Sequence, residues 1–198
     1  MKANRLVLTV LLLVTAGVFQ LPAQQNEADR KVLAEIRAGA DKGDAKAQYE
    51  LGRAFFSGTL GVAKDEAEAV KWFRKAAEQN VADAQFSLGV RYANGRGVAE
   101  DDAEAVKWFR KAAEQNYADA QYNLGVCYDS GEGVAKDEIE AYKWWLLAAG
   151  HGNDDAKYNM TIVENKMSRE QIAEGRRLAR DFKPRKVPSE GSDARLPP

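Results

Sequence analysis

Acidic pairs at a fixed spacing are the residues in this chain best arranged for acid–base or calcium chemistry. The pairs, each three residues apart, are Asp65 and Glu68, Asp101 and Glu104, and Asp137 and Glu140. The same D-x-x-E spacing is typical of a helix N-terminus, where an acidic side chain accepts backbone N–H groups that have no partner inside the helix. Because the pattern returns in every copy of a longer repeat, we interpret each pair as a capping box, in which the aspartate and the glutamate each accept a backbone N–H at the start of the helix.

Other residue types that support catalysis are scarce. His151 is the only histidine, so a histidine-based metal site or catalytic triad lacks members, and the sequence contains no S-x-x-K. Cys127 is the only cysteine and cannot form an internal disulfide; it replaces Ala54 and Arg91 at one repeat position, which favours a small packing residue. Glycine pairs such as Gly95 and Gly97 lack the Lys-Ser/Thr of a phosphate loop. The sequence therefore predicts no enzyme, no cofactor and no metal.

The elements that would hold these residues are copies of one module. The stretch DEAEAVKWFRKAAEQN at residues 65–80 returns as DDAEAVKWFRKAAEQN at 101–116 and, edited, as DEIEAYKWWLLAAGHG at 137–152. A second stretch precedes each copy: A-Q-Y-E-L-G-R-A-F, A-Q-F-S-L-G-V-R-Y and A-Q-Y-N-L-G-V-C-Y, with a fragment A-K-Y-N-M at 156–160. A repeat step of 36 residues indicates modules that bury their apolar faces by stacking.

Both stretches have helical periodicity, so the predicted fold class is all-α: an α-solenoid of helix pairs. In the first helix Gln48, Leu51, Gly52 and Phe55 form the framework face. Glycine in mid-helix costs about 1 kcal/mol relative to alanine, and its return at each copy predicts a close helix–helix crossing. In the second helix the buried positions are Ala69, Trp72, Phe73 and Ala76.

The module boundaries predict a solenoid over residues 24–183. It comprises a starting half-repeat at 26–42, repeats at about 44–80, 81–116 and 117–152, a partial repeat at 153–166, and a capping helix at 168–182 that opens with the capping box Ser168–Gln171. Leu146 and Leu147 replace charged residues of the earlier copies. We expect the capping helix to cover them; a partner-binding apolar patch is the alternative. Residues 184–198 are expected to be a disordered tail.

The N-terminus has the organisation of a secretory signal. Lys2 and Arg5 precede a 14-residue apolar run at 6–19, and a small residue, Ala23, follows. We predict a signal peptide over residues 1–23 and a periplasmic or secreted protein; an uncleaved membrane anchor is the alternative. Removing this segment takes away two cations and no anion, so the formal net charge falls from −1 to −3. Such a balance argues against a nucleic-acid partner.

The pattern A-Q-x-x-L-G-x-x-Y-x-x-G-x-G-V-x-x-D-x-x-x-A-x-x-W-x-x-x-A-A closely resembles the Sel-one-like repeat (SLR), a relative of the tetratricopeptide repeat. The resemblance covers residues 43–152 in three copies. It implies antiparallel helix pairs in a right-handed superhelix, used as an adaptor for other proteins, with the first helices lining the concave side.

On this basis a partner groove for a protein or peptide is predicted along the first helices. Its residues at matching positions are Tyr49, Arg53, Phe56, Phe86, Val90, Tyr122, Val126, Asp129 and Tyr158. Four of them would form an aromatic ladder, namely Tyr49, Phe86, Tyr122 and Tyr158. The alternative is that these rings pack between neighbouring repeats.

The leading hypothesis is an exported, non-enzymatic scaffold whose groove binds a protein or peptide of unknown identity. A cell-envelope enzyme is one alternative, because some secreted, disulfide-rich SLR proteins are named as β-lactamases or penicillin binders; the single cysteine and the absence of S-x-x-K depart from that pattern. A secreted effector that acts on a host protein is another. The membrane is expected as a partner only through an uncleaved signal segment.

Overall fold

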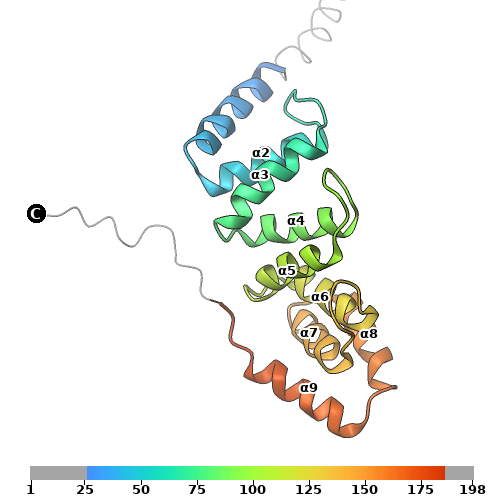
Figure 1. Ribbon diagram of the computed structural model, residues 1–198. Coiled ribbons are helices and arrows are strands. Elements are labelled where there is room, and N and C mark those ends of the chain that lie inside the picture. The colour runs from blue at the N-terminus through green and yellow to red at the C-terminus, as the bar shows by residue number, and fades with distance from the viewer. Residues whose placement is uncertain (1–25, 186–198) are drawn as a thin grey trace, which may run out of the picture.

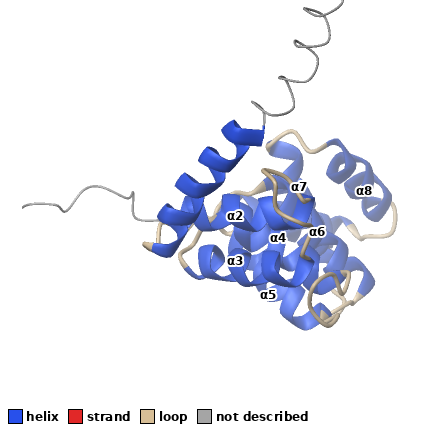
Figure 2. Ribbon diagram, turned by 90° about the horizontal axis from the view of Figure 1, so that it is seen from above, coloured by secondary structure: helices blue, strands red, loops and turns tan. Residues whose placement is uncertain are grey.

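The computed structural model describes residues 26–185, and this part of the chain contains helices and loops without strands (Figures 1 and 2). A helix over 26–41 comes first. It is followed by α2 (Ala45–Ser57), α3 (Glu66–Glu78), α4 (Ala82–Ala93), α5 (Asp102–Ala113), α6 (Ala118–Ser130), α7 (Glu138–Gly150), α8 (Asp154–Glu164) and α9 (Arg169–Asp181). The predicted all-α solenoid is confirmed. The predicted signal peptide and most of the predicted tail lie outside the described residues.

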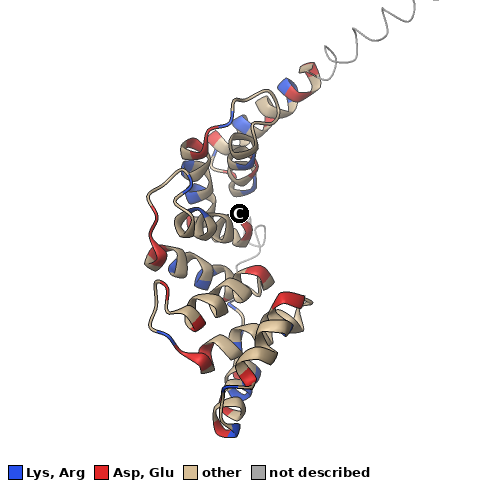
Figure 3. Ribbon diagram, turned by 90° about the vertical axis from the view of Figure 1, so that its right-hand side faces the viewer, with Lys and Arg blue, Asp and Glu red and all other residues tan. Residues whose placement is uncertain are grey.

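The helices pack in chain order. The pairs α2–α3, α4–α5 and α6–α7 form the repeats, and α3–α4, α5–α6 and α7–α8 join each repeat to the next, while α9 packs back on α7. The result is a curved stack with α2 and α3 near one end and α9 at the other (Figures 1 and 3). Within the described residues, no helix is long and apolar enough to cross a membrane.

The mid-helix glycines mark the helix crossings, as predicted. A Cβ added at Gly52 or Gly89 would lie 2.7 Å from the ring of the phenylalanine that faces it, Phe73 or Phe109. At Gly125 the facing ring is an indole, and the added Cβ would lie 2.5 Å from its nitrogen. The cost of glycine in a helix is therefore offset by an aromatic ring that packs directly on the backbone.

The turns between paired helices contact the preceding repeat. Gly97 has φ +77°, and a Cβ there would collide with the backbone carbonyl of Glu66 at the start of α3. Gly133 makes the same approach to Asp102 at the start of α5. In the first repeat, Gly61 has φ +78° but no atom within 4 Å of its added Cβ. Glycine is therefore needed at all three turns for the left-handed backbone. In the second and third repeats it is also needed because the turn contacts the backbone of the preceding repeat.

The predicted acidic caps are correct, but the predicted reciprocal half of the capping box is wrong. Oδ1 of Asp65 accepts the N–H of Glu68 at 2.9 Å, and Asp101 and Asp137 cap α5 and α7 in the same way. The backbone N–H of Asp65, however, donates to the carbonyl of Phe55 at 2.8 Å. That donor is therefore already satisfied by the preceding helix, and the Glu68 carboxylate pairs with Lys71 instead. A complete capping box is present at Ser168 and Gln171.

Buried glutamines tie three helices together in each of the first two repeats. Gln85 on α4 donates its side-chain amide to the carbonyl of Ala77 at the end of α3 (3.0 Å), and its Oε1 accepts from Gln115 beyond α5 (2.7 Å). Gln48 makes the equivalent bonds to Ala40 and Gln79. These bonds satisfy both halves of a buried amide, which would otherwise cost stability.

The capping helix α9 covers the last repeat. Its Gly175 lies so close to α7 that an added Cβ would be 2.6 Å from the ring of Tyr142. Phe182, the last of its apolar residues, packs edge-on against Trp144 with ring centroids 5.4 Å apart. Leu146 and Leu147 are half-buried against two separate core clusters, which include Ile172 and Phe182 respectively.

Candidate functional site

At the N-terminal end of the predicted partner groove, Tyr49 and Phe86 each lie beside other aromatic rings. Tyr49 is half-buried, 5.7 Å from the ring of Phe73, and its burial raises its pKa. Phe86 lies between Phe109 and Tyr117, with ring centroids 6.0 and 5.2 Å away. Such distances are those of aromatic pairs in a core. In this half of the stack the two rings therefore pack against aromatic side chains of the paired helix.

Phe56 is covered by cations from the next repeat. The guanidinium carbon of Arg91 lies 3.9 Å from the Phe56 ring centroid, and that of Arg96 lies 4.9 Å from it. Arg96 and Lys64 also bind Glu66, and their hydrogen bonds lower the pKa of that carboxyl to about 2. Phe56 therefore belongs to a contact between repeats.

The other two predicted groove residues in the N-terminal half, Arg53 and Val90, differ in how exposed they are. Arg53 is exposed and pairs with Glu50 at 3.3 Å on the same helix. Val90 is half-buried against the core cluster.

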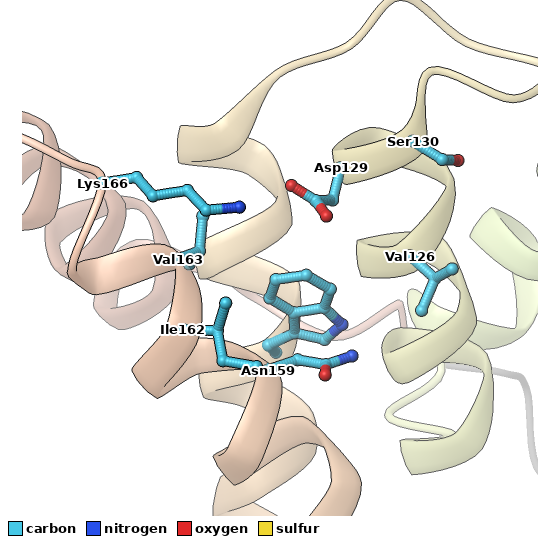
Figure 4. A pocket seen from close by; sticks show the side chains of 8 residues that line it. Val126, Asp129, Ser130, Asn159, Ile162, Val163 and Lys166 are labelled. Carbon is cyan, nitrogen blue, oxygen red and sulfur yellow. The ribbon is translucent and has the colours of Figure 1, made fainter.

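The C-terminal end of the predicted groove is open. There α6, α7 and α8 enclose a pocket of about 200 Å³ (Figure 4). We call it the C-terminal pocket; its lining residues are Val126, Asp129, Ser130, Trp145, Asn159, Ile162, Val163 and Lys166. Tyr158, one helical turn before Ile162, is 69% exposed, and Ile162 is 39% exposed. Large apolar side chains at such exposure beside a pocket are typical of a recognition surface.

Apolar and charged groups have separate places in this pocket. The indole of Trp145 is nearly buried, and its N–H donates to the carbonyl of Tyr122 at 3.1 Å, so the ring offers hydrocarbon to the pocket. Asp129 and Lys166 extend toward each other from opposite sides (Figure 4). The carboxylate of Asp129 is 4.0 Å from Lys136, a distance at the limit of an ion pair. Both charges are thus available at the mouth of the pocket.

The structure brings two predicted groove residues, Val126 and Asp129, into one pocket, whereas Tyr158 is exposed on α8 and does not line it. Tyr122 is half-buried and packs against the core cluster beneath. The sequence prediction missed Ile162 and Lys166. Their signal was present: Ile162 stands 36 residues after Val126, and Lys166 stands 36 after Ser130. The prediction stopped because the recognisable motif of the fourth first helix ends at Met160.

The described residues show little that would support other chemistry. They contain no cluster of three or more histidine, cysteine, aspartate or glutamate side chains arranged to hold a metal ion. Cys127 is half-buried, and burial, together with Glu132 and Asp102, raises the pKa of its thiol to about 11. A thiol with a raised pKa is a poor nucleophile at neutral pH.

Stacked helix pairs with a repeat step of 36 residues define an α-solenoid of repeats. The family model of the Sel1 repeat matches the chain three times, over residues 45–81, 82–117 and 118–153. These spans make up more than half of the chain, so the protein belongs to the Sel1 repeat family. Proteins of this family are generally protein-interaction scaffolds. A comparison with curated proteins finds no match.

Solved structures that are similar to the chain include two repeat proteins. A Sel1 repeat protein from Oxalobacter formigenes is 40% identical, with a TM-score of 0.62, over 66% of this chain and 98% of that one. A protective antigen present in uropathogenic Escherichia coli strains, displaying an SLR fold, is 30% identical with a TM-score of 0.58. The latter match covers 77% of this chain and 40% of the antigen.

Proposed function

We propose that the protein is an exported, non-enzymatic scaffold that binds a protein or peptide along its first helices. The observation that carries this proposal is the open end of the predicted groove: Ile162, which lines the C-terminal pocket, and Tyr158, one helical turn before it, are both exposed. Most large apolar side chains of the described residues are buried or half-buried, so the exposure of two of them one turn apart on α8 favours a surface that a partner covers.

Export is supported by the N-terminal sequence. The basic residues, the apolar run and the small residue at position 23 form the pattern of a secretory signal. We infer that the mature scaffold works in the periplasm or outside the cell. N-terminal sequencing of the protein purified from its native cell tests this directly: a mature N-terminus near residue 24 supports export, and an intact Met1 contradicts cleavage.

The binding surface is tested with a photo-crosslinking amino acid placed at one position at a time. A crosslinker at Tyr158 should capture a discrete partner in the native cell, identified by mass spectrometry. Val32 on the first helix is the matched control, because it is also an exposed large apolar residue (43%) but lies at the other end of the stack. Equal capture from both positions, or no capture from either, would contradict the proposal.

A variant separates binding from folding. Tyr158→Ala removes a side chain that is 69% exposed, so we expect its melting temperature to change by less than about 2 °C while capture of the partner falls. Tyr122→Ala is a poorer test, because Tyr122 also packs against the core. Hydrolysis of a chromogenic β-lactam by the purified protein would contradict the non-enzymatic part of the proposal.

A further inference from the structure

The first helix of each repeat lies next to the first helix of the following repeat, and the residues at three such joints can be compared. The joints are α2–α4, α4–α6 and α6–α8, which we call the N-terminal, middle and C-terminal joints. The repeat places Phe56, Ala93 and Asp129 at one equivalent position. It places Arg91, Cys127 and Val163 at the position that faces it. Because the backbone is repeated, these two side chains determine what space each joint leaves.

The N-terminal joint is filled. Its phenylalanine, Phe56, lies under the guanidinium of Arg91 at 3.9 Å. Nε and Nη1 of Arg91 are buried and have no hydrogen-bond partner among the described residues, so this guanidinium is held by the aromatic ring. The middle joint holds the smaller pair Ala93 and Cys127, and both are half-buried against the main core cluster.

The C-terminal joint is open for a physical reason. Its two positions hold Asp129, a short charged side chain that turns to the mouth, and Val163, which is much smaller than arginine. The indole of Trp145 forms the floor where the other joints have Phe73 and Phe109. The pocket of about 200 Å³ is the space that remains.

This volume fits one side chain. Small-molecule and cofactor sites enclose about 300–1,000 Å³, whereas a cavity of about 150 Å³ accepts benzene. A leucine, methionine or phenylalanine side chain therefore matches the pocket, and a nucleotide or a flavin exceeds it. The mouth adds a requirement of charge, because Asp129 lies on one side and Lys166 on the other (Figure 4).

We propose that the C-terminal pocket binds one large apolar side chain from a peptide segment of the partner, and that this segment carries a basic residue beside Asp129 and an acidic residue beside Lys166. This inference rests on the proposed function and specifies its partner. Opposite charges on the two sides fix the direction of the segment, because a reversed segment would place like charges together. The N-terminal and middle joints take no part in this anchoring.

The experiment uses a phage-displayed library of random 12-residue peptides on the immobilised full-length protein. We expect enriched peptides to share one large apolar residue with a basic residue on one side and an acidic residue on the other. Selection on a Lys166→Glu variant should enrich peptides with two basic residues around the apolar one. Selection on Asp129→Lys should enrich two acidic residues, because each substitution gives the mouth a single sign of charge.

Affinity measurements on the enriched peptides complete the test. Ile162→Asp should weaken binding at least about tenfold, since it places a charge where the apolar side chain enters. Arg53→Asp is the matched control, because Arg53 has the same repeat position as Ile162 but lies on α2, at the other end of the stack, where it is exposed. It should leave affinity within about twofold. A circular-dichroism melt of each variant shows that the stack remains folded.

Two results would overturn the inference. If peptides are enriched but their affinity and charge pattern do not respond to Ile162→Asp, Lys166→Glu or Asp129→Lys, the pocket is not the anchor, while peptide binding by the scaffold stands. If no peptide is enriched on any of the proteins, both the inference and the proposed mode of binding are contradicted.

Discussion

The side-chain amide of Gln115 donates to Oε1 of Gln85 over 2.7 Å and joins the end of α5 to α4 within the second repeat. Gln79 and Gln48 make the same bond one repeat earlier, at 2.8 Å. In the third repeat the donor position is occupied by His151, whose Nδ1 lies 2.9 Å from the carbonyl of Leu147. Oε1 of Gln121 is consequently buried without a hydrogen-bond partner among the described residues.

His151→Gln should therefore stabilise the protein. His151 has nearly the same backbone conformation as Gln79, φ −97° and −87° respectively, so a glutamine there is placed to reach Gln121. Satisfying a buried acceptor should raise the free energy of unfolding by about 1 kcal/mol, measured by urea denaturation. His151→Ala supplies no donor and is the control; an equal gain in both variants would show that the missing bond is not the cause.

Gly97→Ala should destabilise the stack far more than Gly61→Ala. Both glycines have a positive φ, so both substitutions carry the left-handed strain of about 1–2 kcal/mol. Only Gly97 faces a backbone carbonyl, that of Glu66, which would have to move. Urea denaturation of the two variants gives the difference, and equal losses would mean that contact between repeats adds nothing at this turn.

Leu88→Ala tests the core of the central repeat. Leu88 is fully buried, and removal of such a side chain typically costs 2–5 kcal/mol, so we expect a loss of about that size in the free energy of unfolding. A loss below about 0.5 kcal/mol, the range of ordinary surface substitutions, would contradict its burial.

Phe182→Ala tests how the last repeat is closed. Phe182 contacts Trp144 and precedes Arg185, whose N–H donates to the carbonyl of Glu114 at 2.7 Å. We expect a loss of about 1–3 kcal/mol, less than for a fully buried phenylalanine because the side chain is half-exposed. Hydrogen exchange should show faster exchange in α9. Lys183→Ala, an exposed neighbour, should leave both measurements unchanged.

Cys127 should react slowly in the folded protein. Its pKa is raised from 9.0 to about 11, so the thiolate fraction at pH 8 is about a hundredfold lower than for an unshifted thiol. Alkylation by iodoacetamide at pH 8 should therefore accelerate strongly in urea, and its rate in the folded state should keep rising up to about pH 11. Equal rates in the folded and unfolded protein would contradict the shift.

The sequence predicted the stack well because its rules are local and repeated. Glycines, capping aspartates and the 36-residue step each act within one module, so three copies report the same constraint. The hydrogen bonds at the helix caps were predicted only in part. The N–H of Asp65 donates to the carbonyl of Phe55 in the preceding helix, and the D-x-x-E pattern cannot reveal that partner.

The candidate site was predicted only in part for a similar reason. Matching positions suggested a uniform groove, but Phe56 is covered by Arg91 from the next repeat, while Asp129 has Val163 opposite it. Which position of a groove stays open depends on pairs of residues from different copies. That information is present in the sequence only when equivalent positions are compared across the joints.

The paired bonds of Gln48 and Gln85 show that the first two repeats are built from interchangeable parts. A gene that lost or duplicated residues 82–117 would therefore encode a shorter or longer rod whose ends and distal pocket are preserved. Such a molecule is an adjustable spacer: its length can change by whole modules without redesign of the surface at its tip.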